Sequence, residues 1–331
     1  MTRIGVLGAG SWGTALADLL ARKGHVVRIW AREAEVVASI NREHENQLFL
    51  TGHGLAPSLV ADADAGQVVA GADVVVSASP SHAVRHVIGE VASAIRPDAL
   101  IVSATKGIED ASLARMSEVI GTVIPGARVT VLSGPSFASE VAASQPTAVV
   151  AASLDPDAAA EAQELFSTPV FRVYTNRDVT GVELGGSLKN VIAIAAGTLE
   201  GLGLGHNPRA ALLTRGLAEI TRLGAALGAE PATFAGLAGM GDLILTATGA
   251  LSRNRALGMA LARGESFETW QARNRTVAEG ANTSRAAARL AQRAGVEMPI
   301  AEEVLAVLFE GKSARDSVRD LMERELKAEQ W

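Results

Sequence analysis

Residues 3–32 read RIGVLGAGSWGTALADLLARKGHVVRIWAR, and this stretch decides the fold. A short apolar strand pattern runs into Gly8, Gly10 and Gly13 in the spacing G-x-G-x-x-G, and a helical pattern and a second apolar strand follow. Gly8 permits a tight turn, Gly10 lets the backbone approach a pyrophosphate, and Gly13 lets the helix pack closely on the sheet. The free N–H groups at the helix N-terminus favour phosphates. The stretch therefore predicts a dinucleotide site inside a βαβ unit.

Short β-rich runs alternate with helical patterns through the rest of the first half, at DVVVSAS, ALIVSAT, RVTVLS and TAVVAAS. Continuous apolar strands interleaved with helices are typical of a parallel sheet covered on both faces. A further helix is expected over residues 155–166 and a last strand over residues 171–175. The first half is therefore predicted to be an α/β domain of the Rossmann type.

The strand pattern disappears beyond residue 176, where long segments rich in Ala, Leu, Glu and Arg are interrupted by Gly and Pro. Breakers at that spacing delimit helices. The chain has 331 residues, and a prior of roughly 150 residues per domain predicts two domains. We expect the Rossmann-type domain over residues 1–180 and an all-α domain over residues 181–331.

The composition narrows the class of protein. Asp and Glu number 36 against 30 Lys and Arg, and this balance argues against a nucleic-acid or acidic-membrane partner. The absence of cysteine excludes disulfides, thiolate metal sites and a cysteine nucleophile. The N-terminus has no export-signal pattern, and the most apolar run, residues 191–199, is shorter than the roughly 20 residues of a membrane span. We expect a cytoplasmic protein that is not integral to a membrane.

The segment GVELGGSLKNVIAIAAGTLEG, residues 181–201, carries Lys189 among glycines, alanines and aliphatic residues. No other charge lies between Glu183 and Glu200. Burying an ammonium group is costly unless the group is paired or loses its proton. Lys189 therefore either lies along the apolar surface with its head in water, or has a function in a buried site.

The end of the second predicted strand bears on the choice of cofactor. It carries Arg32 followed by Glu33, at the place where an NAD enzyme often has an acid for the adenosine ribose. Arg32 can receive a 2′-phosphate, which favours NADP(H). Glu33 can instead meet a ribose hydroxyl, so the use of NAD(H) stays open.

The segment GLAGMGDLILTATGALSRNRALG, residues 236–258, joins a lone Asp242 to a helix-start pattern at Ser252. Arg253 and Asn254 fall in the first turn of that helix, where free N–H groups and the positive end of the helix dipole favour an anion. A guanidinium group there makes a phosphate grip. Taken alone, the pattern also fits an ordinary N-capped surface helix.

Two further groups of polar residues are candidates for a site. Lys106 follows the strand ALIVSAT, at the carboxyl end of the predicted sheet, where ligands collect, so a site role is favoured over a solvated loop. His82 and His86 have the i, i+4 spacing of one helix face, but no third ligand of suitable type is apparent. A surface helix is favoured there, and no metal is expected.

Seven motifs stand in order along the chain: GAGSWGTALA near the N-terminus, TKGIE at 105–109, SGPSFASEV at 133–141, SLKN at 187–190, GDLILTATG at 241–249, SRN at 252–254 and VAEG at 277–280. Together they closely resemble the bacterial NAD(P)-dependent glycerol-3-phosphate dehydrogenases. The resemblance extends from about residue 3 to about residue 310, in the order and spacing of that family.

The resemblance implies reversible hydride transfer between NAD(P)H and dihydroxyacetone phosphate, giving sn-glycerol 3-phosphate for phospholipid synthesis. It also implies that a Rossmann-type domain is followed by a helical domain like that of 6-phosphogluconate dehydrogenase, and that the protein is a homodimer. By position, Lys189 matches the catalytic proton donor or acceptor, and Asp242 matches the acid beside it.

Further positions of the site follow from the matched motifs. Asn190 and Thr246 are expected to hydrogen-bond substrate oxygens. The other substrate-binding positions, beside Lys189 and Asp242, are Lys106, Gly134, Ser136, Ser252, Arg253 and Asn254. The cofactor-binding positions are Gly8, Gly10, Ser11, Trp12, Gly13, Arg32, Phe49, Lys106, Ala138, Arg253, Val277 and Glu279.

One segment departs from the family pattern. Family members usually carry N-x-x-Y/F-L-P-G after the second strand, whereas this chain reads NQLFLTGHGLAP, with Thr51 in place of the proline. The departure concerns the conformation of the loop near Phe49 and that residue's contact with the cofactor.

Two other kinds of protein fit part of the pattern. A two-domain dehydrogenase for a β-hydroxy acid or ketopantoate shares the expected fold and needs an anion grip of the same kind. A non-catalytic NADP(H) sensor shares the cofactor site, but it has no need for Lys189, Asp242 and the arginine turn in one domain. A nucleotide-sugar dehydrogenase is excluded because its thiohemiacetal step requires a cysteine.

Overall fold

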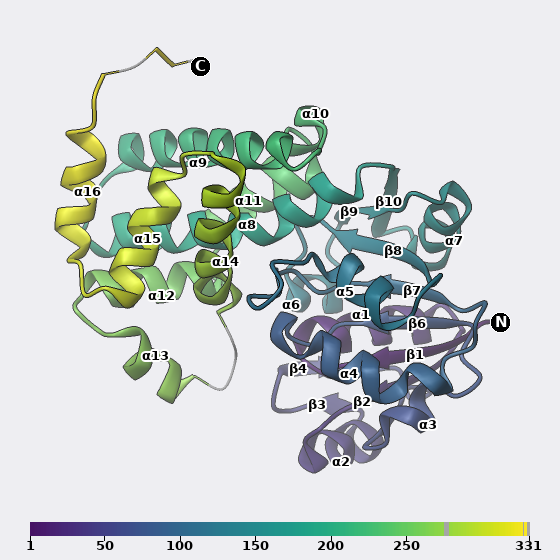
Figure 1. Cartoon of the computed structure of the whole chain (residues 1–331). Helices are drawn as coiled ribbons and strands as arrows, with labels where there is room; N and C mark the ends of the chain where they lie inside the picture. Colours follow the sequence, from purple (N-terminus) through teal and green to yellow (C-terminus); the bar gives the residue numbers. More distant parts are fainter. Residues whose placement is uncertain (275–277, 327, 330–331) are drawn as a thin grey trace.

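A computed structural model describes residues 1–274, 278–326 and 328–329 (Figure 1). Its N-terminal half is built on one eight-stranded sheet, and its C-terminal half is helical, so the predicted fold class is confirmed. The strands of the main sheet are β1 (Arg3–Leu7), β2 (Val26–Trp30), β5 (Val60–Asp62), β6 (Val74–Ser77), β7 (Leu100–Ser103), β8 (Arg128–Ser133), β9 (Thr147–Ala152) and β10 (Phe171–Asn176).

The strand order in the main sheet is β10-β9-β8-β7-β6-β1-β2-β5. Strands β5, β2, β1, β6, β7 and β8 are parallel, as predicted, but β9 pairs antiparallel with β8 and parallel with β10. The prediction of an all-parallel sheet was therefore wrong at its last two strands. The connection from β8 to β9 holds only the short helix α6 (Ala138–Ala142), which does not span the sheet as a parallel crossover requires.

Helices cover both faces of the sheet because its central strands are apolar throughout. Helices α1, α6 and α7 pack in one layer, and α3, α4 and α5 pack in the other. A small antiparallel pair, β3 (Glu45–Asn46) and β4 (Leu50–Gly54), lies outside the main sheet and was not predicted. The helices of this half are α1 (Ser11–Arg22), α2 (Ala34–Glu43), α3 (Ala65–Val69), α4 (Val84–Val91), α5 (Met116–Val123), α6 and α7 (Pro156–Phe166).

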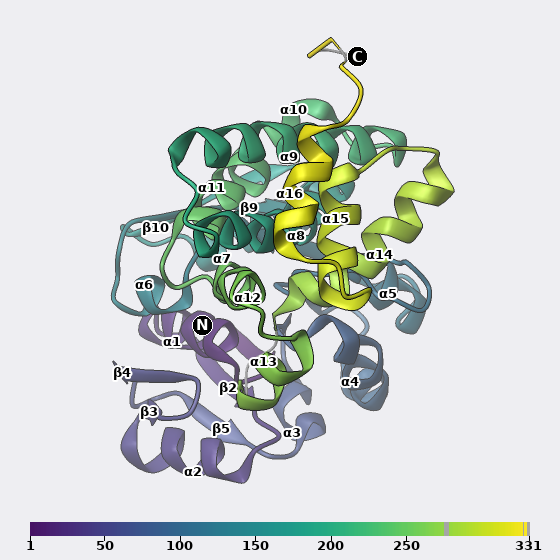
Figure 2. The same cartoon turned by 90° about the vertical axis from the view of Figure 1, so that its left-hand side faces the viewer.

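The helical half is arranged around α8 (Val179–Gly201), which is buried along almost its whole length. Figures 1 and 2 show that this half adjoins the end of the sheet to which the parallel strands point. The other helices are α9 (His206–Ala226), α10 (Pro231–Phe234), α11 (Asp242–Thr248), α12 (Arg253–Ala262), α13 (Phe267–Arg273), α14 (Glu279–Ala294), α15 (Pro299–Phe309) and α16 (Ala314–Met322). A π-helical turn, η3 (Leu237–Gly241), leads into α11.

Helices α8 and α12 cross with their backbones in contact. A Cβ atom at Gly197 would lie 2.0 Å from the carbonyl oxygen of Arg255, and a Cβ atom at Gly258 would lie 2.0 Å from that of Ile194. No side chain larger than hydrogen fits at such a distance. The two glycines therefore set the position of α12 relative to α8.

The helices of the described residues bear on the membrane prediction. Among them, no single helix has both the length and the apolar composition needed to cross a bilayer. One pair of segments, Pro231–Thr248 and Arg253–Ala262, meets the criteria of length and composition together, with a bend of 49° between its parts.

Candidate active site

The glycine-rich turn between β1 and α1 fits a dinucleotide pyrophosphate. Gly8 has a φ of +114°, and a Cβ atom at Gly13 would lie 1.9 Å from the carbonyl oxygen of Gly8. A Cβ atom at Gly10 would meet no atom within 4 Å, so open space lies beside the turn. Gly10 is the N-cap of α1 and provides no side-chain cap, which leaves the first N–H groups of the helix for an anion.

The loop that carries Phe49 is tied to this turn. Ser11 Oγ donates to the carbonyl oxygen of Phe49 (2.6 Å), and the Phe49 N–H donates to Asn46 Oδ1 (3.0 Å). Asn46 Nδ2 in turn donates to the carbonyl oxygen of Ala9 (2.9 Å). Thr51, the second residue of β4, donates from Oγ1 to the Gln47 carbonyl oxygen (2.9 Å) and so ties the strand to the turn before it. Asn46 was missed by the sequence analysis, because its partners are distant in sequence.

Other predicted cofactor residues border the same turn. Trp12 is in the first turn of α1, and Ala138 begins α6, which packs against α1. Arg32 follows β2, and its Nη2 lies 2.8 Å from Glu33 Oε1, with 83% of the arginine side chain exposed. These residues surround the turn, but their contacts with a cofactor stay a prediction.

Lys189 is buried in a polar cluster and does not lie along the surface. The residue is 5% exposed, and its Nζ donates to Asp242 Oδ1 (2.6 Å) and Thr246 Oγ1 (2.5 Å). Asp242 is 1% exposed and begins α11, with Thr246 one turn later on the same face. Helix α8 lies very close to Ala238 and Ser133 at two glycines. A Cβ atom at Gly185 would lie 2.6 Å from the carbonyl oxygen of Ala238, and one at Gly186 would lie 2.4 Å from Ser133 Oγ.

Lys106 joins the sheet half to this cluster. It follows β7, as predicted, and its Nζ donates to Asp242 Oδ2 (2.6 Å) and to the carbonyl oxygen of Gly134 (2.9 Å). Ser136 Oγ donates to the same carbonyl oxygen (3.1 Å). One buried carboxylate thus receives two ammonium groups, one from each half of the molecule.

The surroundings of Lys189 change its acidity. Burial lowers the pKa of Lys189 to about 7, the charge of Asp242 opposes this shift, and the charge of Lys106 adds to it. An ammonium group with such a pKa can release and regain its proton near neutral pH.

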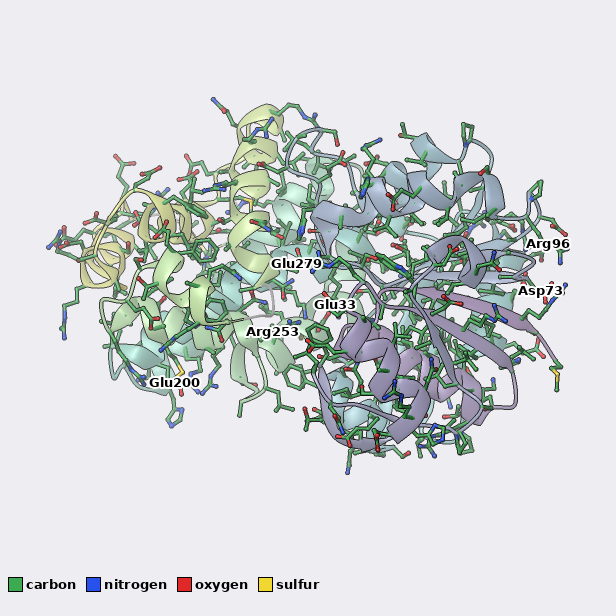
Figure 3. All side chains as sticks on the ribbon, turned by 90° about the horizontal axis from the view of Figure 1, so that it is seen from below. Glu33, Asp73, Arg96, Glu200, Arg253 and Glu279 are labelled. Carbon is green, nitrogen blue, oxygen red and sulfur yellow. The ribbon has the colours of Figure 1, made fainter. Side chains whose placement is uncertain are left out.

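The N-terminus of α12 has the predicted form. Ser252 is the N-cap, and its Oγ accepts a hydrogen bond from the N–H of Arg255 (3.2 Å). Figure 3 places Arg253 where the two halves of the molecule meet, with Glu279 also labelled there. Partial burial lowers the pKa of Arg253, and the charge of Glu279 opposes this effect, but a guanidinium group stays protonated at physiological pH.

Asn190 and Asn254 are bonded to each other. Asn254 Nδ2 donates to Asn190 Oδ1 (2.9 Å), and the N–H of Gly280 donates to Asn254 Oδ1 (3.0 Å). The three residues come from α8, α12 and α14. Both predicted amide residues are therefore brought to the junction of three helices beside Lys189 and Arg253.

Glu279 connects the two halves through a residue that the sequence analysis missed. The N–H of Ser81 donates to Glu279 Oε1 (3.1 Å), and Ser81 Oγ donates to Glu279 Oε2 (2.6 Å). Ser81 comes shortly after β6, at the same edge of the sheet as Lys106, and this position was the available signal for it. Val277 lies outside the described residues, and its cofactor contact stays a prediction.

Within residues 1–274, 278–326 and 328–329, no group of three or more His, Cys, Asp or Glu side chains is placed to hold a metal ion. His86 Nε2 instead lies 3.3 Å from Glu90 Oε1 on α4, and both side chains are largely exposed.

Known proteins of one family are similar to this chain over almost its whole length. Residues 3–159 match the family described as NAD-dependent glycerol-3-phosphate dehydrogenase N-terminus, and residues 178–319 match the C-terminus of the same family. A protein of Geobacter sulfurreducens named glycerol-3-phosphate dehydrogenase [NAD(P)+] is 57% identical over 332 residues, which cover 99% of each chain.

A solved structure of a glycerol-3-phosphate dehydrogenase has the same fold as this chain. The crystal structure of a glycerol-3-phosphate dehydrogenase from Coxiella burnetii is 40% identical, covers 98% of this chain and 99% of its own, and has a TM-score of 0.94. A ketopantoate reductase from Ralstonia eutropha has a TM-score of 0.61 at 16% identity, which shows a shared fold and no more. The sequence, the fold and the relatives agree that this chain belongs to the family of NAD(P)-dependent glycerol-3-phosphate dehydrogenases.

Proposed function

We propose that this chain reduces dihydroxyacetone phosphate reversibly to sn-glycerol 3-phosphate, with Lys189 as the group that exchanges the proton. The observation that supports this most directly is the buried Lys189–Asp242 pair, which receives a second ammonium group from Lys106. When bound at the glycine-rich turn, NAD(P)H supplies the hydride. The chain's own residues hold the substrate and move the proton.

Lys189 has the properties of a general acid and base. Its pKa of about 7 allows it to donate a proton to the substrate oxygen during reduction and to accept one during oxidation. Asp242 and Thr246 hold Nζ in one place, so the proton stays at a defined position. Lys106 holds the other carboxylate oxygen and keeps it from turning away.

The function is tested by mixing the purified protein with NADPH and dihydroxyacetone phosphate and following the absorbance of NADPH. We expect rapid oxidation with the phosphorylated ketone and slow oxidation with unphosphorylated dihydroxyacetone, because binding energy at the phosphate positions the reacting carbon. Equal rates with both ketones would contradict a phosphate grip, and no oxidation with either would contradict the proposed reaction.

Arg253→Ala tests the phosphate grip. We expect KM for dihydroxyacetone phosphate to rise about 30-fold, because a charge-assisted hydrogen bond to the phosphate is lost. The rate with unphosphorylated dihydroxyacetone should stay within about twofold. Arg263→Ala, on an exposed arginine just after the same helix, is the matched control. Steady-state kinetics with both ketones measures the effect, and an equal loss with both would contradict the assignment.

The pH dependence should differ between the two directions. Reduction needs protonated Lys189, so its kcat/KM should fall as pH rises through about 7, whereas oxidation needs the neutral amine and should rise over the same range. Glu219 in α9 also has a pKa raised to about 7 by burial. Glu219→Gln removes that second group, and the opposite profiles should survive it. Profiles of the same sign in both directions would exclude Lys189 as the proton carrier.

We propose that Arg32 favours NADP(H). It is largely exposed at the end of β2, and its present partner is Glu33, which a 2′-phosphate can replace. Arg32→Ala should raise KM for NADPH about 20-fold and change KM for NADH less than about twofold. Glu33→Ala, which frees the guanidinium group, should not weaken NADPH binding. A parallel change with both cofactors would contradict the assignment.

The remaining predictions are also proposals. We place the domain boundary near residue 180, because β10 ends at Asn176 and α8 begins at Val179. The resemblance supports a homodimer and a cytoplasmic enzyme that supplies glycerophospholipid synthesis. Light scattering during size-exclusion chromatography tests the homodimer. A single species with the mass of one chain would contradict it.

A further inference from the structure

The amide groups of Asn190 and Asn254 can be oriented without ambiguity. A backbone N–H can only donate, so the atom of Asn254 that lies 3.0 Å from the N–H of Gly280 must be its oxygen. The other end of the Asn254 amide is then its NH₂ group, which can also only donate. The atom of Asn190 that lies 2.9 Å from it must therefore be Oδ1.

This chain of bonds leaves Nδ2 of Asn190 free. In the described part of the protein, no acceptor takes a hydrogen bond from that nitrogen, although Asn190 is only 5% exposed. The nitrogen is not among the fully buried side-chain atoms that lack a partner, so water or a ligand can reach it and supply the acceptor. Asn190 directly follows Lys189 on α8, and Asn254 directly follows Arg253 on α12, so both amides lie next to residues of the proposed site along their helices.

The geometry is held by close packing. A Cβ atom at Gly280 would lie 2.6 Å from the carbonyl oxygen of Asn190 and 2.8 Å from Asn254 Oδ1. Asn254 itself is 8% exposed. The N–H of Gly280 therefore remains close to the Asn254 oxygen, and rotation of either amide by half a turn would place like groups against each other.

We propose that Asn254 is a positioning residue that holds Asn190 with its NH₂ group toward the substrate, so that Asn190 donates to a substrate oxygen and cannot accept from one. This inference rests on the proposed site. It suits both directions of the reaction: a ketone oxygen only accepts, and an alcohol oxygen can accept from Asn190 while its own proton goes to Lys189. An Asn190 carbonyl at that place would compete with Lys189 for the alcohol proton.

A double-mutant cycle tests the proposal. Asn254→Asp keeps an acceptor for Gly280 but puts an oxygen opposite Asn190 Oδ1, so Asn190 should turn and face the site with its oxygen. We expect kcat for reduction to fall about 30-fold in the native background, in keeping with the loss of one positioned donor. In the Asn190→Ala background, the same change should alter kcat less than about twofold. The added charge should raise KM in both backgrounds alike.

An equal fall of kcat in both backgrounds would overturn the proposal, because Asn254 would then act without Asn190. Thermal melting and NADPH binding check that each variant is folded, and Asn254→Ala repeats the cycle if the aspartate variant is not. A second measurement uses the unaltered protein: the side-chain amide resonances of Asn190, assigned by their loss in Asn190→Ala, should shift when dihydroxyacetone phosphate binds. Unmoved resonances would also overturn the proposal. Neither result depends on whether Lys189 carries the proton, so failure of that role is seen separately.

Discussion

Replacing Lys189 by methionine should lower kcat about 1,000-fold in both directions, because the chain loses its proton donor and acceptor. Methionine matches the length of the buried stem, and Asp242 keeps Lys106 as its partner, so the fold should persist. NADPH affinity should stay within about twofold, since the glycine-rich turn lies in the other half of the molecule. Steady-state turnover and NADPH fluorescence titration measure the two quantities.

The same variant separates an enzyme from a cofactor sensor. A sensor would keep its full response to NADPH and would have no turnover to lose. Lys312→Met is the matched control, because Lys312 also pairs with two acids in the helical half but lies away from the cluster around Asp242. Retention of more than about a tenth of kcat in Lys189→Met would show that another group or water carries the proton.

Asp242→Asn should lower kcat for reduction about 300-fold at pH 7. The change keeps the shape of the side chain but removes the charge that opposes the effect of burial on Lys189. The pKa of Lys189 should fall further, so more of it is neutral, and the loss should be larger at pH 8 than at pH 6. Rates measured across this range distinguish a change of pKa from a simple loss of orientation, which would be the same at every pH.

Asp242→Asn should also destabilise the protein, by about 3 kcal/mol, because two ammonium groups lose their buried counter-ion. Urea unfolding measures this. The matched control is Glu183→Gln, which removes another buried carboxylate of the helical half, one that pairs with Arg115. The control should lose stability but keep kcat and the shape of the pH profile. A control with the same kinetic defect would mean that the loss in Asp242→Asn is structural.

Much of this architecture is visible in the sequence, because its determinants are local. The glycine spacing after the first strand predicted the turn at Gly8, and the serine before Arg253 predicted the N-cap of α12. At the turn and the N-cap, the residue type and its immediate neighbours determine the local structure. From the isolated Lys189 alone, a surface lysine and a buried functional group were both open, and the matched motifs along the chain favoured the second.

Features that depend on residues distant in sequence were not predicted. Asn46 of β3 is bonded in this way to Ala9 of the first turn, 37 residues earlier. The reversal at β9 is a different case, because it follows from the short connection after β8, a local feature that the strand pattern does not report. The position of Ser81 after β6 was a signal for a site residue, but its bond to Glu279 joins residues 198 positions apart in sequence. The pairing of Asp242 with Lys106 as well as Lys189 likewise requires both halves of the molecule to be in place.

The glycine crossing of α8 and α12 bears on which substrates laboratory evolution can reach. Lys189 and Arg253 stand on these two helices, and main-chain contact at Gly197 and Gly258 fixes their separation. Side-chain substitutions in the pocket cannot lengthen that separation, because no side chain determines it. Selection for a phosphorylated ketone with one more carbon between carbonyl and phosphate should therefore favour insertions in the loop before Ser252. Selection for substrates that differ on the side of the carbonyl away from the phosphate should instead succeed through single amino-acid substitutions.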